Sequence, residues 1–335
     1  MEIQEYISLK PYNTFGIEAT ARYFSPFVSV DELGVLFEKY QTLQHIIFGG
    51  GSNILMTKDF NGLVAKNNIK GISVVKEDET YVYVKCGAGE NWHKFVLYCI
   101  ENNLAGVENL SLIPGSVGAS PIQNIGAYGV EIKDVFHDLE AWNISDKKLV
   151  NFTTSDCEFG YRESVFKHKY KGKFVITSVT FRLTKQPVYS TSYGAIQQEL
   201  ERMGVEKFSI KAISDAVTNI RKSKLPDPEV IGNAGSFFKN PTIPIQQYEQ
   251  LKVKFPQIVA YPFINEMKLA AGWLIDQCGW KGYRKGDAGC HAKQALVSVN
   301  YGNANGNEIY NLSTEILQSV QNKFGILLER EVNVI

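Results

Sequence analysis

The chain has 335 residues, which at a typical domain size of roughly 150 residues predicts about two domains. Hydrophobic residues make up 44% of the sequence and charged residues 21%, so the chain can form a folded core and wholesale disorder is excluded. Lysine plus arginine and aspartate plus glutamate number 35 each, and this zero net charge argues against a general binder of nucleic acid or of anionic membranes.

No apolar run approaches the roughly 20 residues that cross a bilayer, and the first residues lack the basic and apolar regions of a signal peptide. The sequence therefore predicts a cytoplasmic protein without membrane insertion. Its cysteines are odd in number and form no C-x-x-C pair, which argues against a disulfide framework or a zinc ribbon. We expect no bound metal and reduced, mostly buried thiols at Cys86, Cys99, Cys157, Cys278 and Cys290.

The first elements in chain order are those of an α/β unit. The pattern predicts a helix over 31–40, a short apolar strand over 45–48 and a loop over 49–53. An alternating strand over 80–86 then leads through a glycine turn into another helix. The apolar stripe of that helix is formed by Trp92, Phe95, Val96, Cys99 and Ile100.

Residues 111–129 carry few charges and many small side chains, and six glycines or prolines interrupt them. Neither a regular helix nor a regular strand tolerates this composition, so a long ordered loop is predicted. Such loops are usually functional, because glycine lets backbone N–H groups approach a ligand closely.

The second half begins with predicted strands over 139–144 and 174–184, and then a helix that ends before Pro226. We expect the main domain boundary just before that helix. Further helices are predicted over 246–255, 269–278 and 309–324, with a strand over 295–300. Gly325 ends the last helix, and the alternation from Leu327 to Ile335 predicts a final strand.

The common nucleotide and hydrolase motifs are not matched. Residues 87–92 lack the third glycine of the dinucleotide fingerprint, and Gly172-Lys173 is followed by Phe174 where a Walker loop needs Ser or Thr. No G-x-S-x-G occurs, so a serine-hydrolase elbow is unsupported. The loops 49–53 and 114–129 could still present N–H groups to a pyrophosphate, although glycines in such loops often serve turn geometry alone.

Eight segments in order carry a resemblance: residues 13–16 (NTFG), 49–53 (GGGSN), 113–119 (IPGSVGA), 123–129 (QNIGAYG), 159–162 (FGYR), 224–228 (KLPDP), 232–241 (GNAGSFFKNP) and 271–276 (AGWLID). Together they resemble the UDP-N-acetylenolpyruvoylglucosamine reductases, the flavoenzymes that make UDP-N-acetylmuramate for bacterial cell walls. The resemblance runs from about Asn13 to the end of the chain.

The resemblance implies an α+β protein with an FAD-binding fold of the vanillyl-alcohol-oxidase type, built from two α/β subdomains, and a C-terminal α+β substrate domain. The expected boundaries are 1–70 for the first FAD-binding subdomain, completed by the strand 326–335, and 71–208 for the second. Residues 209–325 are expected to bind the UDP-sugar. A monomer is expected.

For the cofactor, the resemblance implies FAD held without a covalent bond, with NADPH as the hydride donor. The residues expected to contact FAD all lie in the two glycine-containing loops. They are Gly49, Gly50, Gly51, Ser52, Asn53, Pro114, Gly115, Ser116, Gly118, Ala119, Ser120, Ile122, Gln123, Asn124, Gly126, Ala127 and Tyr128.

The implied reaction is the NADPH-dependent reduction, through FAD, of the enolpyruvyl ether of UDP-N-acetylglucosamine-enolpyruvate to UDP-N-acetylmuramate. Hydride addition places negative charge beside the substrate carboxylate, so catalysis needs a cation there and an acid at the neighbouring carbon. The resemblance assigns the cation to Arg162, the proton donor to Ser236 and an acidic partner to Glu331. Without it, Ser236 reads as a turn hydroxyl and Glu331 as an exposed charge.

The resemblance also implies a substrate site. Tyr193 matches the tyrosine of a loop that folds over the substrate, in the form of the family that has this loop. Arg221 and Lys224 lie one turn apart on a helix and would by default be a solvated cationic patch. The residues expected to contact the UDP-sugar are Tyr161, Tyr193, Arg221, Lys224, Asn240 and Gln294.

Two other functions are compatible with parts of this sequence pattern. A flavoprotein of the same fold that oxidises an alcohol or hydroxy acid would need a base near its substrate, where this chain has Gly235-Ser236. A degenerate UDP-sugar-binding protein would retain the pocket alone, whereas Arg162, Ser236 and Glu331 are all present. The sequence therefore favours an enzyme of peptidoglycan synthesis.

Overall fold

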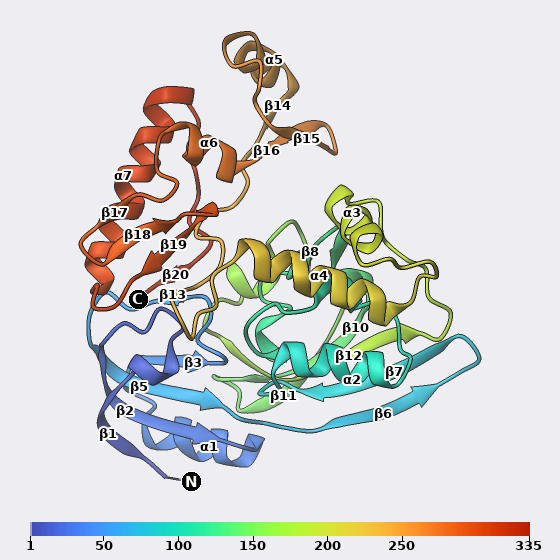
Figure 1. The fold of residues 1–335 in the computed structure, drawn as a ribbon. Coiled ribbons are helices and arrows are strands. Elements are labelled where there is room, and N and C mark those ends of the chain that lie inside the picture. The colour runs from blue at the N-terminus through green and yellow to red at the C-terminus, as the bar shows by residue number, and fades with distance from the viewer. Residues whose placement is uncertain (1) are drawn as a thin grey trace. The chain divides into compact units, whose positions relative to one another are not determined.

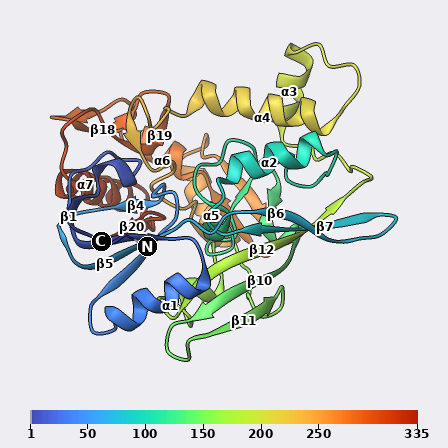
Figure 2. The same ribbon diagram turned by 90° about the horizontal axis from the view of Figure 1, so that it is seen from below.

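The structure is a computed structural model that describes residues 2–335. It divides into two compact units, whose segments can be followed by colour in Figures 1 and 2. The first unit contains the segment that ends at Ile7, together with Ala21–Gly50 and Asn61–Ser223. The second contains Ser8–Thr20, Gly51–Phe60 and Lys224–Ile335.

The core of the first unit is an antiparallel sheet whose strands follow the order β11-β10-β12-β7-β6. Helix α2 (Trp92–Glu101) runs along this sheet (Figure 1) and buries Trp92, Phe95, Val96 and Cys99 against it. The predicted strands and helix in these segments are confirmed. The confirmed strands are β7 (Tyr81–Gly87), β10 (Phe136–Asn143) and β12 (Phe174–Thr184), whereas β6 (Ile72–Glu77) and β11 (Lys148–Thr153) were not predicted.

A smaller sheet has the order β1-β2-β5-β3, from β1 (Gln4–Ser8), β2 (Thr20–Phe27), β5 (Phe60–Asn67) and β3 (His45–Phe48). Helix α1 (Val30–Lys39) begins after Ser29, whose side chain accepts a hydrogen bond from the N–H of Glu32. The ring centre of Phe37 in α1 lies 5.3 Å from the ring centre of Trp142 in β10, and Figure 2 shows α1 beside β10. The predicted helix over 31–40 and the predicted strand over 45–48 are therefore confirmed.

The segment 111–129 is mostly loop, as predicted, with short elements inside it or next to it. These are η2 (Glu108–Leu110), η3 (Val117–Ala119), β8 (Gly126–Ala127), β9 (Val130–Glu131) and η4 (Ile132–Asp134). Strands β8 and β9 form a two-stranded antiparallel pair. Two further short helices lie elsewhere, η1 (Lys10–Tyr12) and η5 (Val165–Lys167).

Helix α3 (Gly194–Arg202) begins directly after Tyr193, the residue that the resemblance places in a loop over the substrate. It packs against α4 (Ile210–Lys224), and the shared cluster includes Ile196 and Leu200 from α3 and Ile213 and Val217 from α4. Because α4 buries its apolar stripe against α3, the compact units divide between Ser223 and Lys224 and not before the helix. The functional division at 208/209 remains a prediction.

The second unit contains a sheet of order β13-β19-β18-β17, with β13 (Gly232–Asn233), β17 (Arg284–Lys285), β18 (Ala288–His291) and β19 (Gln294–Asn300). Helices α6 (Ala271–Gln277) and α7 (Gly306–Phe324) contact it. Helix α7 starts with a capping box formed by Asn305 and Glu308, and it ends at Gly325, whose φ of 68° is in the left-handed region.

A three-stranded sheet of order β14-β16-β15 completes the second unit, from β14 (Thr242–Pro244), β15 (Ala260–Phe263) and β16 (Glu266–Leu269). Helix α5 (Ile245–Lys254) follows β14 directly.

The predicted final strand over Leu327 to Ile335 is largely wrong, because only β20 (Asn333–Val334) is a strand, paired in parallel with β4 (Ile54–Leu55). Arg330 instead makes an isolated bridge to Phe238. The segment changes partner along its length, so it cannot form one continuous ladder. Its alternation reflects the burial of Leu328 and Val332.

Candidate active site

The two glycine-containing loops touch through their backbones within the first unit. A Cβ built on Gly50 would lie 2.8 Å from Cα of Gly115, and one built on Gly49 would overlap the hydroxyl of Ser116. Side chains at either glycine would therefore push the loops apart. This close packing leaves a surface made of backbone, which suits the binding of a dinucleotide pyrophosphate.

The charges around these loops also fit such a ligand. Residues 49–53 and 114–129 contain no charged side chain. Lys66 in β5 donates a 3.0 Å hydrogen bond from Nζ to the carbonyl of Gly49, and burial, followed by repulsion from Lys70, lowers the pKa of Lys66. The sequence analysis missed Lys66, which nothing in the local pattern distinguishes from other lysines. The residues present fit FAD.

The predicted loop 49–53 belongs to both units, since Gly49 and Gly50 lie in the first and Gly51, Ser52 and Asn53 in the second. A Cβ on Gly51 would overlap the carbonyl of Tyr12. The side-chain amide of Asn53 donates a 3.2 Å hydrogen bond to the carbonyl of Glu331. Asn53 therefore holds the segment that carries one of the predicted catalytic residues.

The second loop is held in part by its own polar side chains. The hydroxyl of Ser120 donates to the carbonyl of Val117 over 2.6 Å, and the buried amide of Asn124 donates to Gly160 over 2.9 Å. These two side chains are used within the protein. Contacts to FAD remain predictions for every residue named in the two loops, including these two and Pro114, Gly118, Ala119, Ile122, Gln123, Gly126 and Ala127.

Arg162 lies in a tight turn closed by hydrogen bonds between Gly160 and Glu163, which form an isolated antiparallel bridge. The φ of Arg162 is 56°, a left-handed conformation that costs a residue with a side chain roughly 1–2 kcal/mol. Its guanidinium carbon lies 5.9 Å from the centre of the Tyr161 ring. The strained backbone and the stacked ring fix the direction of this side chain.

Arg221 is partly buried and is not the solvated cation that helix position alone suggested. Its Nε donates a 3.2 Å hydrogen bond to the carbonyl of Leu112. Burial lowers the pKa of Arg221; attraction to Tyr128 opposes this, and repulsion from Arg162 adds to it. The first unit thus brings the two predicted anion-binding arginines close enough for Arg162 to lower the pKa of Arg221.

Two tyrosines complete this cluster. Tyr128 forms a side-chain hydrogen bond with Arg221, and burial is the largest cause of its raised pKa. The ring of Tyr193, at the start of α3, packs edge-on against Tyr128 at 5.6 Å between centres. Asn109, which the sequence analysis missed, donates to the carbonyls of Tyr128 over 3.0 Å and Ser190 over 2.9 Å, so it joins the glycine loop to the Tyr193 segment.

The second unit places the other two predicted catalytic residues on paired backbone. The N–H of Glu331 donates a 2.9 Å hydrogen bond to the carbonyl of Phe237, the residue after Ser236. Before Ser236, Gly235 has a φ of 69°, and its N–H donates to Oδ1 of the buried Asn233 over 3.0 Å. The serine is therefore presented from a turn fixed on both sides.

Asn240 and Gln294, the other predicted substrate residues of this unit, meet at the first turn of α6. Oδ1 of Asn240 accepts a 2.9 Å hydrogen bond from the N–H of Ala271. A Cβ on Gly272 would lie 2.9 Å from Oε1 of Gln294, so glycine is needed there for the amide to approach. Lys224, at the end of α4, is exposed, and its backbone is hydrogen-bonded to His291.

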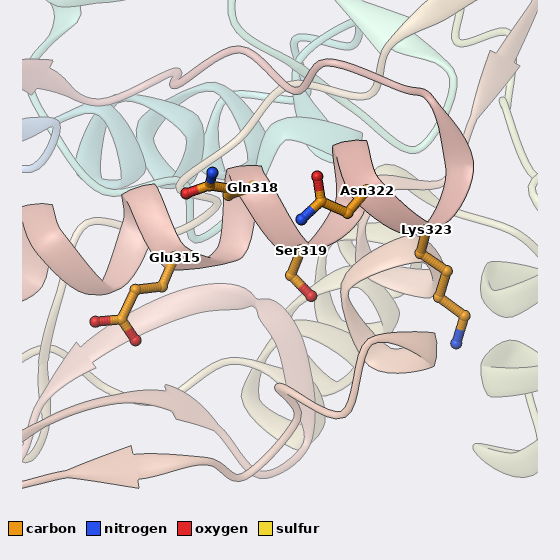
Figure 3. A pocket seen from close by; sticks show the side chains of 5 residues that line it. All are labelled: Glu315, Gln318, Ser319, Asn322 and Lys323. Atoms are coloured by element: carbon orange, nitrogen blue, oxygen red, sulfur yellow. The ribbon is translucent and has the colours of Figure 1, made fainter.

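A surface hollow of about 570 Å³ on α7 lies among polar residues of that one helix (Figure 3). Its two charged residues are already engaged, since Glu315 pairs with Lys285 at 2.9 Å and Lys323 donates to the carbonyl of Gln277. We assign it no site. Among residues 2–335, no group of three or more His, Cys, Asp or Glu side chains is placed to hold a metal ion, and no helix has the length and hydropathy to cross a membrane.

Comparison with known families matches residues 37–153 to an FAD binding domain and residues 227–335 to the C-terminal domain of UDP-N-acetylenolpyruvoylglucosamine reductase. Reductases of that name from Flavobacterium johnsoniae and Amoebophilus asiaticus are each 52% identical to this chain, with 100% of both chains covered. The crystal structure of the enzyme from Thermus caldophilus has a TM-score of 0.67 at 24% identity and covers 99% of this chain and 98% of that one.

These matches confirm the predicted fold class, an FAD-binding fold of the vanillyl-alcohol-oxidase type with a C-terminal α+β domain, and the predicted cofactor FAD. With about half of all positions identical over the whole chain, the chain belongs to the UDP-N-acetylenolpyruvoylglucosamine reductase family and is an FAD-dependent oxidoreductase of peptidoglycan precursor synthesis.

Proposed function

We propose that the protein reduces UDP-N-acetylglucosamine-enolpyruvate to UDP-N-acetylmuramate with NADPH. In the net reaction the carbon–carbon double bond of the enolpyruvyl ether gains one hydride and one proton, and NADPH becomes NADP⁺. FAD, which the loops 49–53 and 114–129 would hold, would supply the chemistry that passes hydride from NADPH to the terminal carbon of the double bond. The side chains of the protein bind the substrate, orient it and supply its proton.

The arginine pair of the first unit is the observation that carries this proposal. Repulsion from Arg162 lowers the pKa of Arg221, and an anionic ligand bound by both would relieve that repulsion. The substrate offers a carboxylate and a pyrophosphate. We assign the carboxylate to Arg162, whose planar and permanently charged guanidinium matches that group, and the pyrophosphate to Arg221 with Lys224.

The negative charge that develops on the substrate explains why Arg162 would accelerate the reaction in addition to binding the substrate. Hydride addition at the terminal carbon leaves negative charge on the neighbouring carbon and its carboxylate. A guanidinium held at that carboxylate stabilises the transition state more than the ground state. We assign to Glu331 a shared role at the same group.

Ser236 is proposed to give its hydroxyl proton to the carbon that bears the charge. A serine is a weak acid, so its contribution depends on position, and the fixed turn at Gly235 supports such a role. Tyr161, Tyr193, Asn240 and Gln294 are proposed to bind the UDP-sugar. The loops 49–53 and 114–129 are proposed to hold FAD.

The test is spectroscopic, with the purified holoprotein. We expect a yellow protein that consumes NADPH beyond one equivalent per flavin only when the enolpyruvyl sugar is present, with UDP-N-acetylmuramate as product. Reduction of the flavin by a hydroxy acid or an alcohol in place of NADPH would favour the flavoprotein oxidase. Sugar binding without NADPH consumption would favour a binding protein.

A further inference from the structure

Arg162 occupies a turn position that favours glycine or asparagine. In the turn Gly160–Glu163, the N–H of Glu163 donates to the carbonyl of Gly160 over 3.3 Å, and Arg162 is the only one of the two central residues with a positive φ. That pattern is typical of a type II turn, whose third position requires a positive φ. The surrounding structure must therefore hold an arginine where its own conformational preference does not.

Lys167 supplies one of these restraints. Its Nζ donates a 3.1 Å hydrogen bond to the carbonyl of Arg162, and the same ammonium lies 3.7 Å from the carboxylate of Glu163. The ammonium thus contacts the last two residues of the turn at once. Lys167 belongs to η5 and is partly buried, so it approaches the turn from a segment fixed by packing of Val165 and Phe166.

Asn124 supplies the second restraint, from the loop predicted to hold FAD. Its side chain is fully buried, and its Nδ2 donates to the carbonyl of Gly160 over 2.9 Å and to the carboxylate of Glu131 over 3.0 Å. Its Oδ1 accepts from the N–H of Lys133 over 3.1 Å. One hydrogen bond from the amide of Asn124 therefore ties the glycine loop to the turn, and the other ties it to Glu131.

A third contact joins the same two segments. The hydroxyl of the buried Ser164 donates to the carbonyl of Ile122 over 2.6 Å. The glycine loop around 122–124 and the arginine turn therefore form one hydrogen-bonded unit. A shift of either segment would move the Arg162 side chain relative to a ligand held by that loop.

We propose that Lys167 and Asn124 are positioning residues for Arg162, acting on the step in which the substrate carboxylate gains charge. This inference rests on the proposed function, in which Arg162 contacts that carboxylate. Neither residue touches substrate. Lys167 holds the carbonyl of Arg162 and Asn124 holds that of Gly160, so that the guanidinium is already oriented when substrate binds.

The test separates the two half-reactions by stopped-flow spectroscopy of the bound flavin. Lys167→Met removes the ammonium donor and keeps the length of the side chain. We expect NADPH oxidation by this variant to stay within about twofold of the parent, and reoxidation by saturating enolpyruvyl sugar to slow by roughly tenfold to a hundredfold, the cost of misplacing a reacting group by about 1 Å.

Rescue and control variants distinguish positioning from a general loss of structure. Lys167→Arg keeps a cationic donor and should recover most of the reoxidation rate. Lys171→Met makes the same change at an exposed lysine four residues further on and should behave like the parent. Flavin content, thermal midpoint and the dissociation constant for UDP-N-acetylmuramate should stay near the parental values in all three variants.

Asn124→Asp tests the second restraint, because a carboxylate would face the carbonyl of Gly160 and the carboxylate of Glu131 without a proton to donate. In the fraction that retains flavin, we expect the same selective slowing of reoxidation. Parental reoxidation in Lys167→Met, or a Lys167→Arg variant as slow as Lys167→Met, would overturn the proposal. Arg162→Met, run in parallel, tests the proposed function: if it reoxidises normally, both ideas fail, whereas a slow Arg162→Met beside a normal Lys167→Met rejects only the positioning role.

Discussion

The backbone N–H of Leu112 donates a 3.0 Å hydrogen bond to Nδ1 of His93, at the start of α2. The carbonyl of Leu112 is also bound, by Nε of Arg221 over 3.2 Å. Leu112 has a φ of 58° and stands just before the Pro114-Gly115 loop. Two side chains therefore hold this left-handed residue, and through it they fix where the loop begins.

This contact makes stability depend on the protonation of His93. Burial, followed by repulsion from Lys222 and Arg221, lowers the pKa of His93 in the folded protein. An unfolded histidine titrates near pH 6.5, so below about that pH the unfolded chain binds a proton that the folded chain does not. The free energy of unfolding should fall as the pH is lowered below about 6.5. The stabilisation that comes from neutral His93 should be fully present above that pH.

We therefore expect His93→Gln, whose side-chain oxygen can accept the same hydrogen bond without titrating, to lose less of its thermal midpoint than the parent between pH 7.5 and pH 5.5. Thermal unfolding followed at both values checks this. His137→Gln, at an exposed histidine, is the control. An equal loss in His93→Gln and the parent would contradict the role of His93.

A second prediction concerns the contact between the two glycine loops. In Gly50→Ala the new Cβ meets backbone, 2.8 Å from Cα of Gly115, so the loops must separate at a cost of roughly 1–3 kcal/mol. We expect a lower thermal midpoint and reduced flavin occupancy after purification. In Gly49→Ala the new Cβ meets the hydroxyl of Ser116, which can rotate, so the loss should be smaller.

The control for this pair is Gly34→Ala, in the interior of α1. A Cβ there meets no atom within 4 Å, so alanine should stabilise the helix by about 0.5–1 kcal/mol and leave flavin occupancy unchanged. If Gly50→Ala retained as much flavin as Gly34→Ala, the assignment of the FAD site to these loops would be wrong.

A third prediction separates the half-reactions at Ser236. NADPH should reduce the flavin of Ser236→Ala at the parental rate, because that step needs no proton on the substrate carbon. Reoxidation by the enolpyruvyl sugar should slow by roughly 10²–10⁴-fold, the usual contribution of a positioned acid. Ser319→Ala, on the hollow of α7, should leave both rates unchanged. Equal slowing of both steps in Ser236→Ala would mark this serine as structural.

A fourth prediction concerns Tyr193, whose side chain is 48% exposed while its ring packs against Tyr128. Tyr193→Phe keeps the ring contact and removes the hydroxyl. If that hydroxyl bonds the pyrophosphate, UDP-sugar affinity should fall by about 1.5–3 kcal/mol, the value of one hydrogen bond to a charged group. Calorimetric titration measures this loss, with flavin content recorded beside it.

The comparison variant is Tyr189→Phe, in the same segment, where the ring packs against Phe208. It should bind the UDP-sugar like the parent. Parental affinity in Tyr193→Phe, or loss of flavin from it, would place this tyrosine elsewhere than at the substrate.

The sequence by itself determined the elements whose stability is local. Helices α1, α2 and α7 follow from apolar spacing and capping residues, because the hydrogen bonds and the caps of a helix join residues that are close in the sequence. The proposal of Arg162, Ser236 and Glu331 as catalytic residues also came from the sequence, since ordered motifs at fixed spacings carry a family resemblance whatever the packing between them.

Tertiary structure alone decided which segments meet. Strands β1, β2 and β5 lack strong alternation and exist because distant strands pair with them. The stripe of α4 indicated burial but not burial against α3, and the alternation after Leu327 indicated burial but not a change of partner. The left-handed turn of Arg162 likewise depends on Lys167 and Asn124, because a strained backbone persists only when contacts from other segments hold it, and no local pattern records those contacts.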